Sequence, residues 1–129
     1  MFITIKDETI SGTILQELNL EFESQTITVK ELISQRVLEE VAQYNKKLPK
    51  FFNGLIEPTD AEKTLNGYKL KKKATIDGEK QVYVALDAFQ KNGYFLLINK
   101  VQSMDLEQKI ELREDTKISF IKLTPLVGG

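Results

Sequence analysis

The chain has 129 residues, of which 41% are hydrophobic and 29% charged, as in an ordinary globular protein long enough to bury one core. Its formal net charge of -1 gives no overall field that would select nucleic acid or an anionic membrane as a partner. It contains no Cys and no His, which excludes disulfides, thiolate nucleophiles, imidazole acid–base catalysis and metal sites built on either side chain.

The other side chains that could support catalysis form no recognisable pattern. Carboxylate, Lys or Tyr catalysis remains possible in principle, but no paired constellation stands out along the chain. We therefore expect a protein that is not an enzyme and has no catalytic residue, metal ligand or cofactor of its own. Residues 1–6 lack the regions of a signal peptide, and no window approaches the roughly 20 apolar residues of a membrane span. Since the lack of Cys fits a reducing compartment, the expected location is the cytoplasm.

Residues 2–22 predict a β-hairpin. The first segment alternates, with Ile3 and Ile5 on one face, and a turn-rich stretch follows from Asp7 to Gly12. Residues 14–22 then alternate again, and two such runs joined by a Gly-containing turn are typical of antiparallel strands. The residues expected to be in register on the second strand are Ile14, Leu18, Leu20 and Phe22.

A helix start follows the hairpin. Thr28 and Glu31 have the spacing of a capping box, in which each side chain binds a free backbone N–H of the first turn. Ile27 and Leu32 are placed to form the hydrophobic staple that accompanies such a box. The helix is expected to end at about Tyr44 or Asn45. Its predicted apolar face consists of Val29, Leu32, Ile33, Val37, Leu38 and Val41.

Residues 46–74 are irregular, and a second helix is predicted from Asp77 to Lys91. Asp77 is the expected N-cap, and Asn92-Gly93 is expected to supply the left-handed residue that ends the helix. The predicted apolar stripe is Val82, Leu86 and Phe89, with Ala85 beside it. We interpret the lysines of residues 69–73, in the irregular region, as solvent-exposed surface charges rather than as a nucleic-acid site. Phe51, Phe52, Leu55 and Ile56 either cover an open end of the core or form an exposed apolar patch.

The last third of the chain predicts strands again. Residues 94–98 form an apolar run typical of an interior strand, and Asn99-Lys100 turns it into Val101-Gln102. A less regular piece is anchored by Leu106, Ile110 and Leu112, and Glu114-Asp115 is expected to turn. The final strand, residues 117–123, alternates with Ile118, Phe120 and Lys122 on one face.

This order of elements resembles the β-grasp fold of ubiquitin and of the small sulfur-carrier proteins of molybdopterin and thiamine biosynthesis. The resemblance covers residues 1–44 and 94–129 and is most specific in the closing strands, residues 94–123. It implies an α+β fold in which a helix crosses a mixed sheet, with the first and last strands side by side at the centre. The whole chain, 1–129, is then one ubiquitin-like domain. Residues 46–93 are an inserted loop-and-helix region relative to the minimal fold, and residues 124–129 are an extended C-terminal tail.

The tail sequence Pro125-Leu126-Val127-Gly128-Gly129 is similar to the tail that these proteins present to an E1-like adenylating enzyme. Gly128 and Gly129 have no Cβ, so their backbone can pass through a narrow channel, and Pro125 stiffens the approach. The resemblance implies that the Gly129 carboxylate is activated with ATP that the partner uses, and is then joined to lysines of target proteins. Further implied partners are an E2-like enzyme and a deubiquitinase-like protease, with no nucleic acid and no membrane. The partner-binding part of the tail is Thr124, Pro125, Leu126 and Val127.

Two alternatives to a protein modifier remain open at this stage. A sulfur carrier would hold a thiocarboxylate on Gly129 and donate sulfide to a biosynthetic enzyme. A non-covalent β-grasp interaction module would have an incidental tail, since a terminal Gly-Gly alone also occurs in frayed chain ends. Deleting Gly129 would separate these classes, because only the interaction module should keep its partner.

Overall fold

The computed structural model describes residues 1–47, 63–64, 67–68 and 77–123. The chain divides into two compact units, residues 1–32 with 88–129 and residues 33–87, and each unit is described by itself. The elements in chain order are β1 (Phe2–Glu8), β2 (Ile14–Glu21), β3 (Thr26–Thr28), α1 (Val29–Lys47), β4 (Lys63–Thr64), β5 (Gly67–Tyr68), α2 (Gly78–Gln90), β6 (Tyr94–Ile98), β7 (Val101–Ser103), β8 (Lys109–Glu111) and β9 (Ile118–Lys122).

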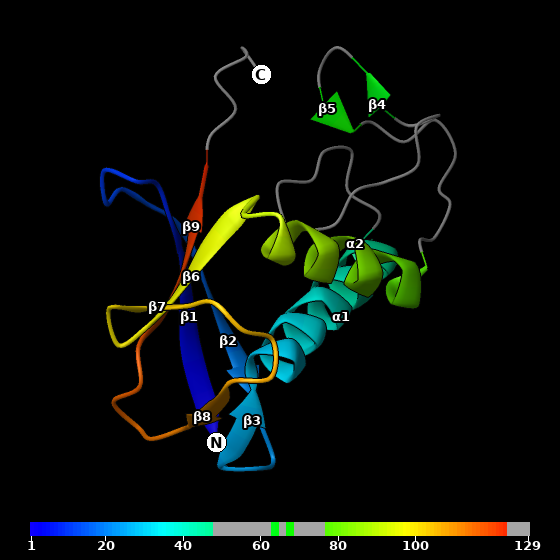
Figure 1. Cartoon of the computed structure of the whole chain (residues 1–129). Helices are drawn as coiled ribbons and strands as arrows, with labels where there is room; N and C mark the ends of the chain where they lie inside the picture. The colour runs from blue at the N-terminus through cyan, green and yellow to red at the C-terminus, as the bar shows by residue number, and fades with distance from the viewer. Residues whose placement is uncertain (48–62, 65–66, 69–76, 124–129) are drawn as a thin grey trace. The chain divides into compact units, whose positions relative to one another are not determined.

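The first unit contains a mixed sheet of five strands in the order β2-β1-β9-β6-β7 (Figure 1). The first and last strands of the chain are neighbours and run parallel, with Ile5 opposite Ile118. The pairs β1–β2, β6–β9 and β6–β7 are antiparallel. The predicted α+β class and the predicted adjacency of the first and last strands are therefore confirmed.

The first hairpin forms as predicted, but its first strand is longer. β1 continues through Asp7 and Glu8, so the prediction that the turn begins at Asp7 is wrong. The alternation of Ile3 and Ile5 carries on to Asp7, and all three side chains are buried. The turn itself lies between Thr9 and Thr13, where Gly12 adopts a positive φ of 93° that favours glycine.

The turn between β6 and β7 is also where the sequence predicted it. Asn99 and Lys100 have φ angles of 50° and 71°, as a two-residue type I′ turn requires. Asn99 tolerates a positive φ because its short polar side chain can hydrogen-bond to the nearby backbone, whereas the long Lys100 side chain cannot. A positive φ is therefore more costly at Lys100. The turn near Glu114 is confirmed by the bond from the Thr116 N–H to the Arg113 carbonyl, 3.0 Å long.

The buried apolar side chains of the first unit come from its strands and from the segments beside them. An aromatic row runs through this set, since the ring centroids of Phe89 and Tyr94 are 6.1 Å apart and those of Tyr94 and Phe120 are 5.7 Å apart. Each buried side chain of this size stabilises the fold by about 1.5–3 kcal/mol. The set is Ile3, Ile5, Leu20, Phe22, Ile27, Val29, Leu32, Phe89, Tyr94, Leu96, Ile110, Leu112, Ile118 and Phe120.

The start of α1 confirms the capping box. The Glu31 N–H donates to Thr28 Oγ1 over 3.0 Å, and the Thr28 N–H donates to Glu31 Oε1 over 3.2 Å. The two other free N–H groups of the first turn, on Val29 and Lys30, donate to the Gln108 and Leu106 carbonyls at 2.9 Å. Just before the helix, β3 pairs with β8 in a two-stranded sheet that the sequence did not predict. The capping box and the two bonds to the Gln108 and Leu106 carbonyls leave no free donor among these four N–H groups.

In the second unit, α1 continues to Lys47, slightly beyond its predicted end. The predicted buried face is confirmed for Ile33, Val37 and Val41, but Leu38 is 49% exposed. The start of α2 approaches α1 closely, because a Cβ on Gly78 would lie 3.0 Å from Leu38 Cδ2. β4 and β5 form a short antiparallel pair.

Both ends of α2 carry the predicted signals. Asp77 Oδ1 accepts a 3.0 Å bond from the Glu79 N–H. At the other end the Gly93 N–H donates to the Ala88 carbonyl and the Asn92 N–H to the Phe89 carbonyl, which is the Schellman pattern. Asn92 is the left-handed residue, with φ of 60°.

The rotation of α2 differs from the predicted apolar stripe. Ala85 and Phe89 are buried as expected, but Val82 and Leu86 are only half-buried, and the third buried position is Gln81. The helix has apolar residues around much of its circumference, so periodicity alone does not select one face. None of the helices in the described ranges is long and apolar enough to cross a membrane.

Candidate functional site

The predicted site residues, Thr124, Pro125, Leu126, Val127, Gly128 and Gly129, lie outside the described residues. The structure describes the strand that leads into them, because β9 ends at Lys122 and Leu123 is the last described residue. The candidate site is therefore the end of β9 and the groups around it. We call this the tail root, and it comprises Lys122, Leu123 and their contacts.

The strand that ends in the tail root, β9, lies between β1 and β6. On the β6 side Lys122 lies opposite Tyr94. On the β1 side the last pair of the parallel ladder is Glu8 with Ile121. Because the Asn99 N–H donates to the Lys117 carbonyl, alternate residues from Lys117 to Ile121 turn their backbone groups toward β6, and the backbone groups of Lys122 face β1.

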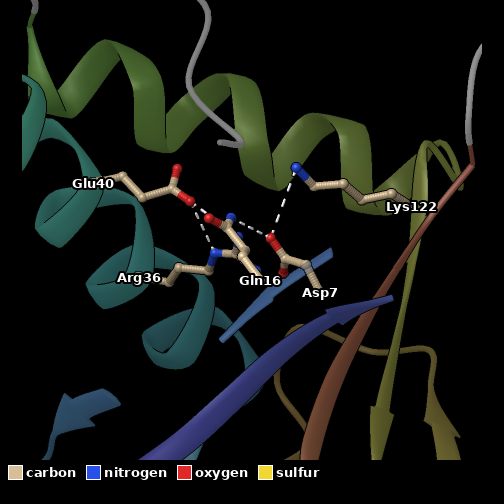
Figure 2. A network of polar contacts seen from close by, with 5 residues as sticks. All are labelled: Asp7, Gln16, Arg36, Glu40 and Lys122. Atoms are coloured by element: carbon tan, nitrogen blue, oxygen red, sulfur yellow. Dashed lines mark hydrogen bonds and ion pairs between the residues drawn. The ribbon is translucent and has the colours of Figure 1, made fainter. Parts of the chain in front are cut away.

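A polar cluster around the buried Asp7 supplies a side-chain contact on the β1 side. The Asp7 side chain is fully buried, and its Oδ2 accepts a 2.6 Å hydrogen bond from Gln16 Nε2 (Figure 2). Lys122 Nζ lies 3.7 Å from the same oxygen, and the Lys122 side chain is 23% exposed. We call Asp7, Gln16 and Lys122 the strand-end cluster, since they join β1, β2 and β9 at one end of the sheet.

The period of the strands explains why these three residues meet. Asp7 follows Ile5 on the buried face of β1, and Gln16 is its direct partner on β2. Asp7 also lies opposite Phe120 on β9, and Lys122 is the next residue of β9 on that face. Burying a carboxylate is costly unless it is paired and hydrogen-bonded, and Gln16 and Lys122 supply both kinds of contact.

A second buried ion pair lies within α1, in the second unit. Arg36 Nε and Nη2 lie 3.1 and 3.0 Å from Glu40 Oε1 (Figure 2). The Arg36 side chain is fully buried and that of Glu40 is 8% exposed. The two residues are one helical turn apart, which places their side chains on the same face.

The opposite face of the five-stranded sheet carries an open groove of about 740 Å³. Half-buried Leu97 and Ile121 line it, and Ile10 of the β1–β2 turn contributes a side chain that is 74% exposed. Charges of both signs surround these apolar groups, including Lys6 and Glu17, whose Nζ and Oε1 are 4.0 Å apart. A mixed apolar and charged surface of this kind can bind a protein.

The part of the chain that the structure describes holds no group of three Asp, Glu, His or Cys side chains that could bind a metal ion.

Sequence reasoning missed Asp7 and Gln16, although a signal for them was present. If the strand that contains Ile3 and Ile5 continues to Asp7, its alternation places the Asp7 carboxylate on the buried face. This was missed because the turn was predicted to start at Asp7. The expectation that Lys122 shares a face with Ile118 and Phe120 agrees with the structure, because Lys122 reaches Asp7 on that face. A lysine and a carboxylate at the ends of adjacent buried faces could have indicated a pair.

The comparisons with known proteins give no relative from which a role could be transferred. No protein-family model matches the chain. Neither a curated protein nor a solved structure matches it significantly.

Proposed function

We propose that this chain is a ubiquitin-like protein modifier of the β-grasp fold. The observation that carries the proposal is the strand order β2-β1-β9-β6-β7, in which the last strand lies inside the sheet and parallel to the first. A capped helix follows the first hairpin, as in the fold that the sequence resembles. With this topology, residues 124–129 follow directly from an interior strand.

The proposed chemistry takes place on the Gly129 carboxylate. A carboxylate oxygen attacks the α-phosphate of ATP in an E1-like enzyme, which forms an acyl-adenylate and releases pyrophosphate. A cysteine thiolate of a partner then attacks the acyl carbon and AMP leaves, giving a thioester. Finally, a lysine amine of the target displaces the thiolate and forms an isopeptide bond.

In these three reaction steps all the catalytic groups belong to the partner enzymes, since the chain has neither Cys nor His. The chain contributes a substrate carboxylate, a tail without Cβ atoms at its last two residues, and a folded body that the partners bind. The groove lined by Leu97, Ile121 and Ile10 lies on a sheet that includes β9, so it is a suitable surface for the activating enzyme.

The experiment compares the N-terminally tagged chain with a Gly129-deleted variant in the native host. Covalent adducts are captured under denaturing conditions and resolved by mass. The proposal predicts adducts of many masses for the full chain and none for the deletion. A Gly129 terminus with one oxygen replaced by sulfur, without adducts, would instead establish the sulfur carrier. Equal recovery of non-covalent partners by both chains, with no modification of Gly129, would contradict the proposal and favour an interaction module.

A further inference from the structure

We propose that the outer edge of β2 is a docking site for an extended, positively charged segment of another protein, which adds to the sheet as a further strand. The site consists of Glu17, Leu18 and Asn19, in the part of β2 whose pairing with β1 is regular. It does not include Gly129. The inference therefore goes beyond the proposed function and can be tested separately from it.

The hydrogen bonds at the end of β2 show which of its backbone groups face outward. The Phe22 N–H donates to the Met1 carbonyl at 2.9 Å, and the Met1 ammonium donates to the Phe22 carbonyl at 3.0 Å. In an antiparallel ladder, such reciprocally bonded pairs alternate with pairs that make no bonds to each other. Leu18 lies four residues before Phe22 in the same register, so its backbone groups face β1. The N–H and C=O groups of Glu17 and Asn19 therefore face away from β1.

The outer side of β2 is open to a further strand. β2 is an end strand of the five-stranded sheet, and no strand in the described ranges pairs with its second side. The side chains of Glu17 and Asn19 are exposed. The other end strand, β7, has only three residues and offers a shorter edge. An edge strand with outward N–H and C=O groups is a template for pairing with another chain.

The edge of β2 lacks two features that commonly keep sheet edges from pairing. Lysine and proline protect many edge strands, and β2 contains neither. A β-bulge also discourages pairing, but the register shift of β2 lies at one end, between Asp7 and Glu8 on the β1 side. Residues 16–21 are in regular register and can accept a straight partner strand.

The charge around this edge selects the kind of partner. Between Lys6 and Lys30 the chain has five acidic residues and no basic one. Glu17 Oε1 lies 4.0 Å from Lys6 Nζ on the β1 side, and the Glu17 side chain is 53% exposed. A cationic side chain opposite Glu17 on an added strand is therefore favourable, because oppositely charged cross-strand pairs stabilise a sheet. A second copy of this chain would bring another acidic strand, and like charges disfavour that pairing. Glu21 has a further contact within the chain and is not assigned to the site.

The two other residues of the site indicate what accompanies the cation. Asn19 Oδ1 accepts a 2.8 Å hydrogen bond from Thr4 Oγ1, and the Asn19 amide nitrogen can donate to a hydroxyl oxygen on the added strand. Leu18 lies on the other face, opposite Ile5, and is half-buried. An apolar β-branched residue beside Leu18 would bury more of its surface. The site therefore fits a segment that alternates cationic, apolar and hydroxyl side chains, such as Arg-Val-Thr-Val-Arg.

The test uses the full chain and this peptide with both ends capped. Binding is followed by NMR, and amide hydrogen exchange is measured with and without the peptide. At about ten times the Kd, exchange at Glu17 and Asn19 should slow by about tenfold. Exchange at Leu18 should not change, because its N–H already faces β1. The Gly129-deleted chain should give the same result as the full chain.

Two N-methylated peptides separate backbone pairing from charge attraction. In an antiparallel arrangement the Thr N–H of the peptide bonds to Asn19, whereas the N–H of the Val that follows points away from β2. Methylation of the Thr nitrogen should weaken binding by at least about tenfold, and methylation of that Val nitrogen should change it by less than about twofold. The peptide Glu-Val-Thr-Val-Glu should bind about tenfold more weakly, since it places a like charge opposite Glu17.

A matched pair of variants tests the same bond from the protein side. Asn19→Pro removes an outward N–H that β1 does not use, so the fold should tolerate it. The control Asn19→Ala also loses the bond to Thr4 but keeps the N–H. The Pro variant should bind the Arg peptide at least about tenfold more weakly than the Ala variant. If the Pro variant does not fold, the two methylated peptides give the same comparison on the wild-type chain.

Several results would overturn the docking site. These are no binding at about 1 mM peptide, equal slowing of exchange at Leu18 and Asn19, or spectral changes confined to Leu97 and Ile121 in the groove. Equal binding of the two methylated peptides would also overturn it. If the peptide protects Glu17 and Asn19 but Gly129 is never conjugated, the docking site stands and the proposed function fails.

Discussion

Replacing Glu40 by Leu removes the carboxylate that Arg36 binds inside α1. The Arg36 side chain is fully buried, and two of its nitrogens lie 3.0 and 3.1 Å from Glu40 Oε1. The variant leaves the guanidinium in a low-dielectric site without this counter-charge. Loss of one partner of a buried pair typically costs about 3–5 kcal/mol, and the whole protein is stabilised by only about 5–15 kcal/mol. We expect the lower end, about 3 kcal/mol, because Glu40 retains slight exposure.

The double variant Arg36→Met with Glu40→Leu should recover most of this loss. It removes both charges and fills the space with apolar groups, so its free energy of unfolding should lie within about 1 kcal/mol of the wild type. Because Arg36→Met alone also removes one partner of the buried pair and costs stability, the coupling between the two sites in a double-mutant cycle is then more than about 2 kcal/mol. An exposed pair behaves differently: Arg113→Met disrupts a contact whose side chains are 75% and 74% exposed, and should cost less than about 1 kcal/mol.

Urea unfolding followed by circular dichroism measures all four proteins of this cycle and the exposed control. The reasoning is refuted if Glu40→Leu is as stable as the wild type, since the buried charge would then be compensated in some other way. It is equally refuted if the double variant is no more stable than the single one. Equal m-values across the series are needed for the comparison to hold.

Three further substitutions test local features. Lys100→Gly relieves the strain of the positive φ of 71° beside Asn99 and should raise the free energy of unfolding by about 1 kcal/mol in thermal melts. The control Lys100→Ala keeps a Cβ and should give no gain. Equal gains for the two variants would contradict this explanation. Thr28→Ala removes the acceptor for the Glu31 N–H and should cost about 1 kcal/mol in urea, so an unchanged midpoint would refute the cap. Ser103→Ala removes a buried hydroxyl that has no hydrogen-bond partner within the described ranges, and calorimetry should show unchanged or slightly higher stability rather than a loss.

Short-range signals in the sequence predicted most of the local structure. The Thr28–Glu31 box, the Asp77 cap and the Asn99-Lys100 turn depend on contacts between residues at most four positions apart. Each of these features is therefore determined by a few residues that are close together in the sequence. The adjacency of β1 and β9 came instead from the resemblance, because no local signal pairs the two ends of a chain.

Features that depend on distant contacts were predicted less well. β3 and β8 have three residues each, and their pairing of Ile27 with Ile110 cannot be inferred from such short runs. The buried face of α2 was predicted wrongly because apolar residues occur on several faces of the helix. The burial of Gln81 depends on tertiary packing, which the local sequence does not contain. Asp7 was assigned to a turn because Asp favours turns, whereas pairing with β2 and β9 keeps it in the strand.

The tail and the proposed insertion, residues 46–93, stay predictions. Residues 124–129 lie outside the described residues, as do Phe51, Phe52, Leu55 and Ile56, so neither of the two interpretations of that apolar group is tested. The lysines of residues 69–73 are outside the described ranges too. What the structure adds is the strand end that precedes the tail.

The most direct test of the proposed function is a search for the branch that trypsin would leave on target lysines. Lys122 is the last Lys or Arg of the sequence, so trypsin cleaves after it and leaves residues 123–129 as a Leu-Thr-Pro-Leu-Val-Gly-Gly branch. Tandem mass spectrometry of proteins from the native host should find this branch on the lysine amines of other proteins, and it should vanish when Gly129 is deleted. Finding residues 123–129 only as an unbranched peptide with a free, unmodified Gly129 carboxylate, while the protein is expressed, would contradict the proposal.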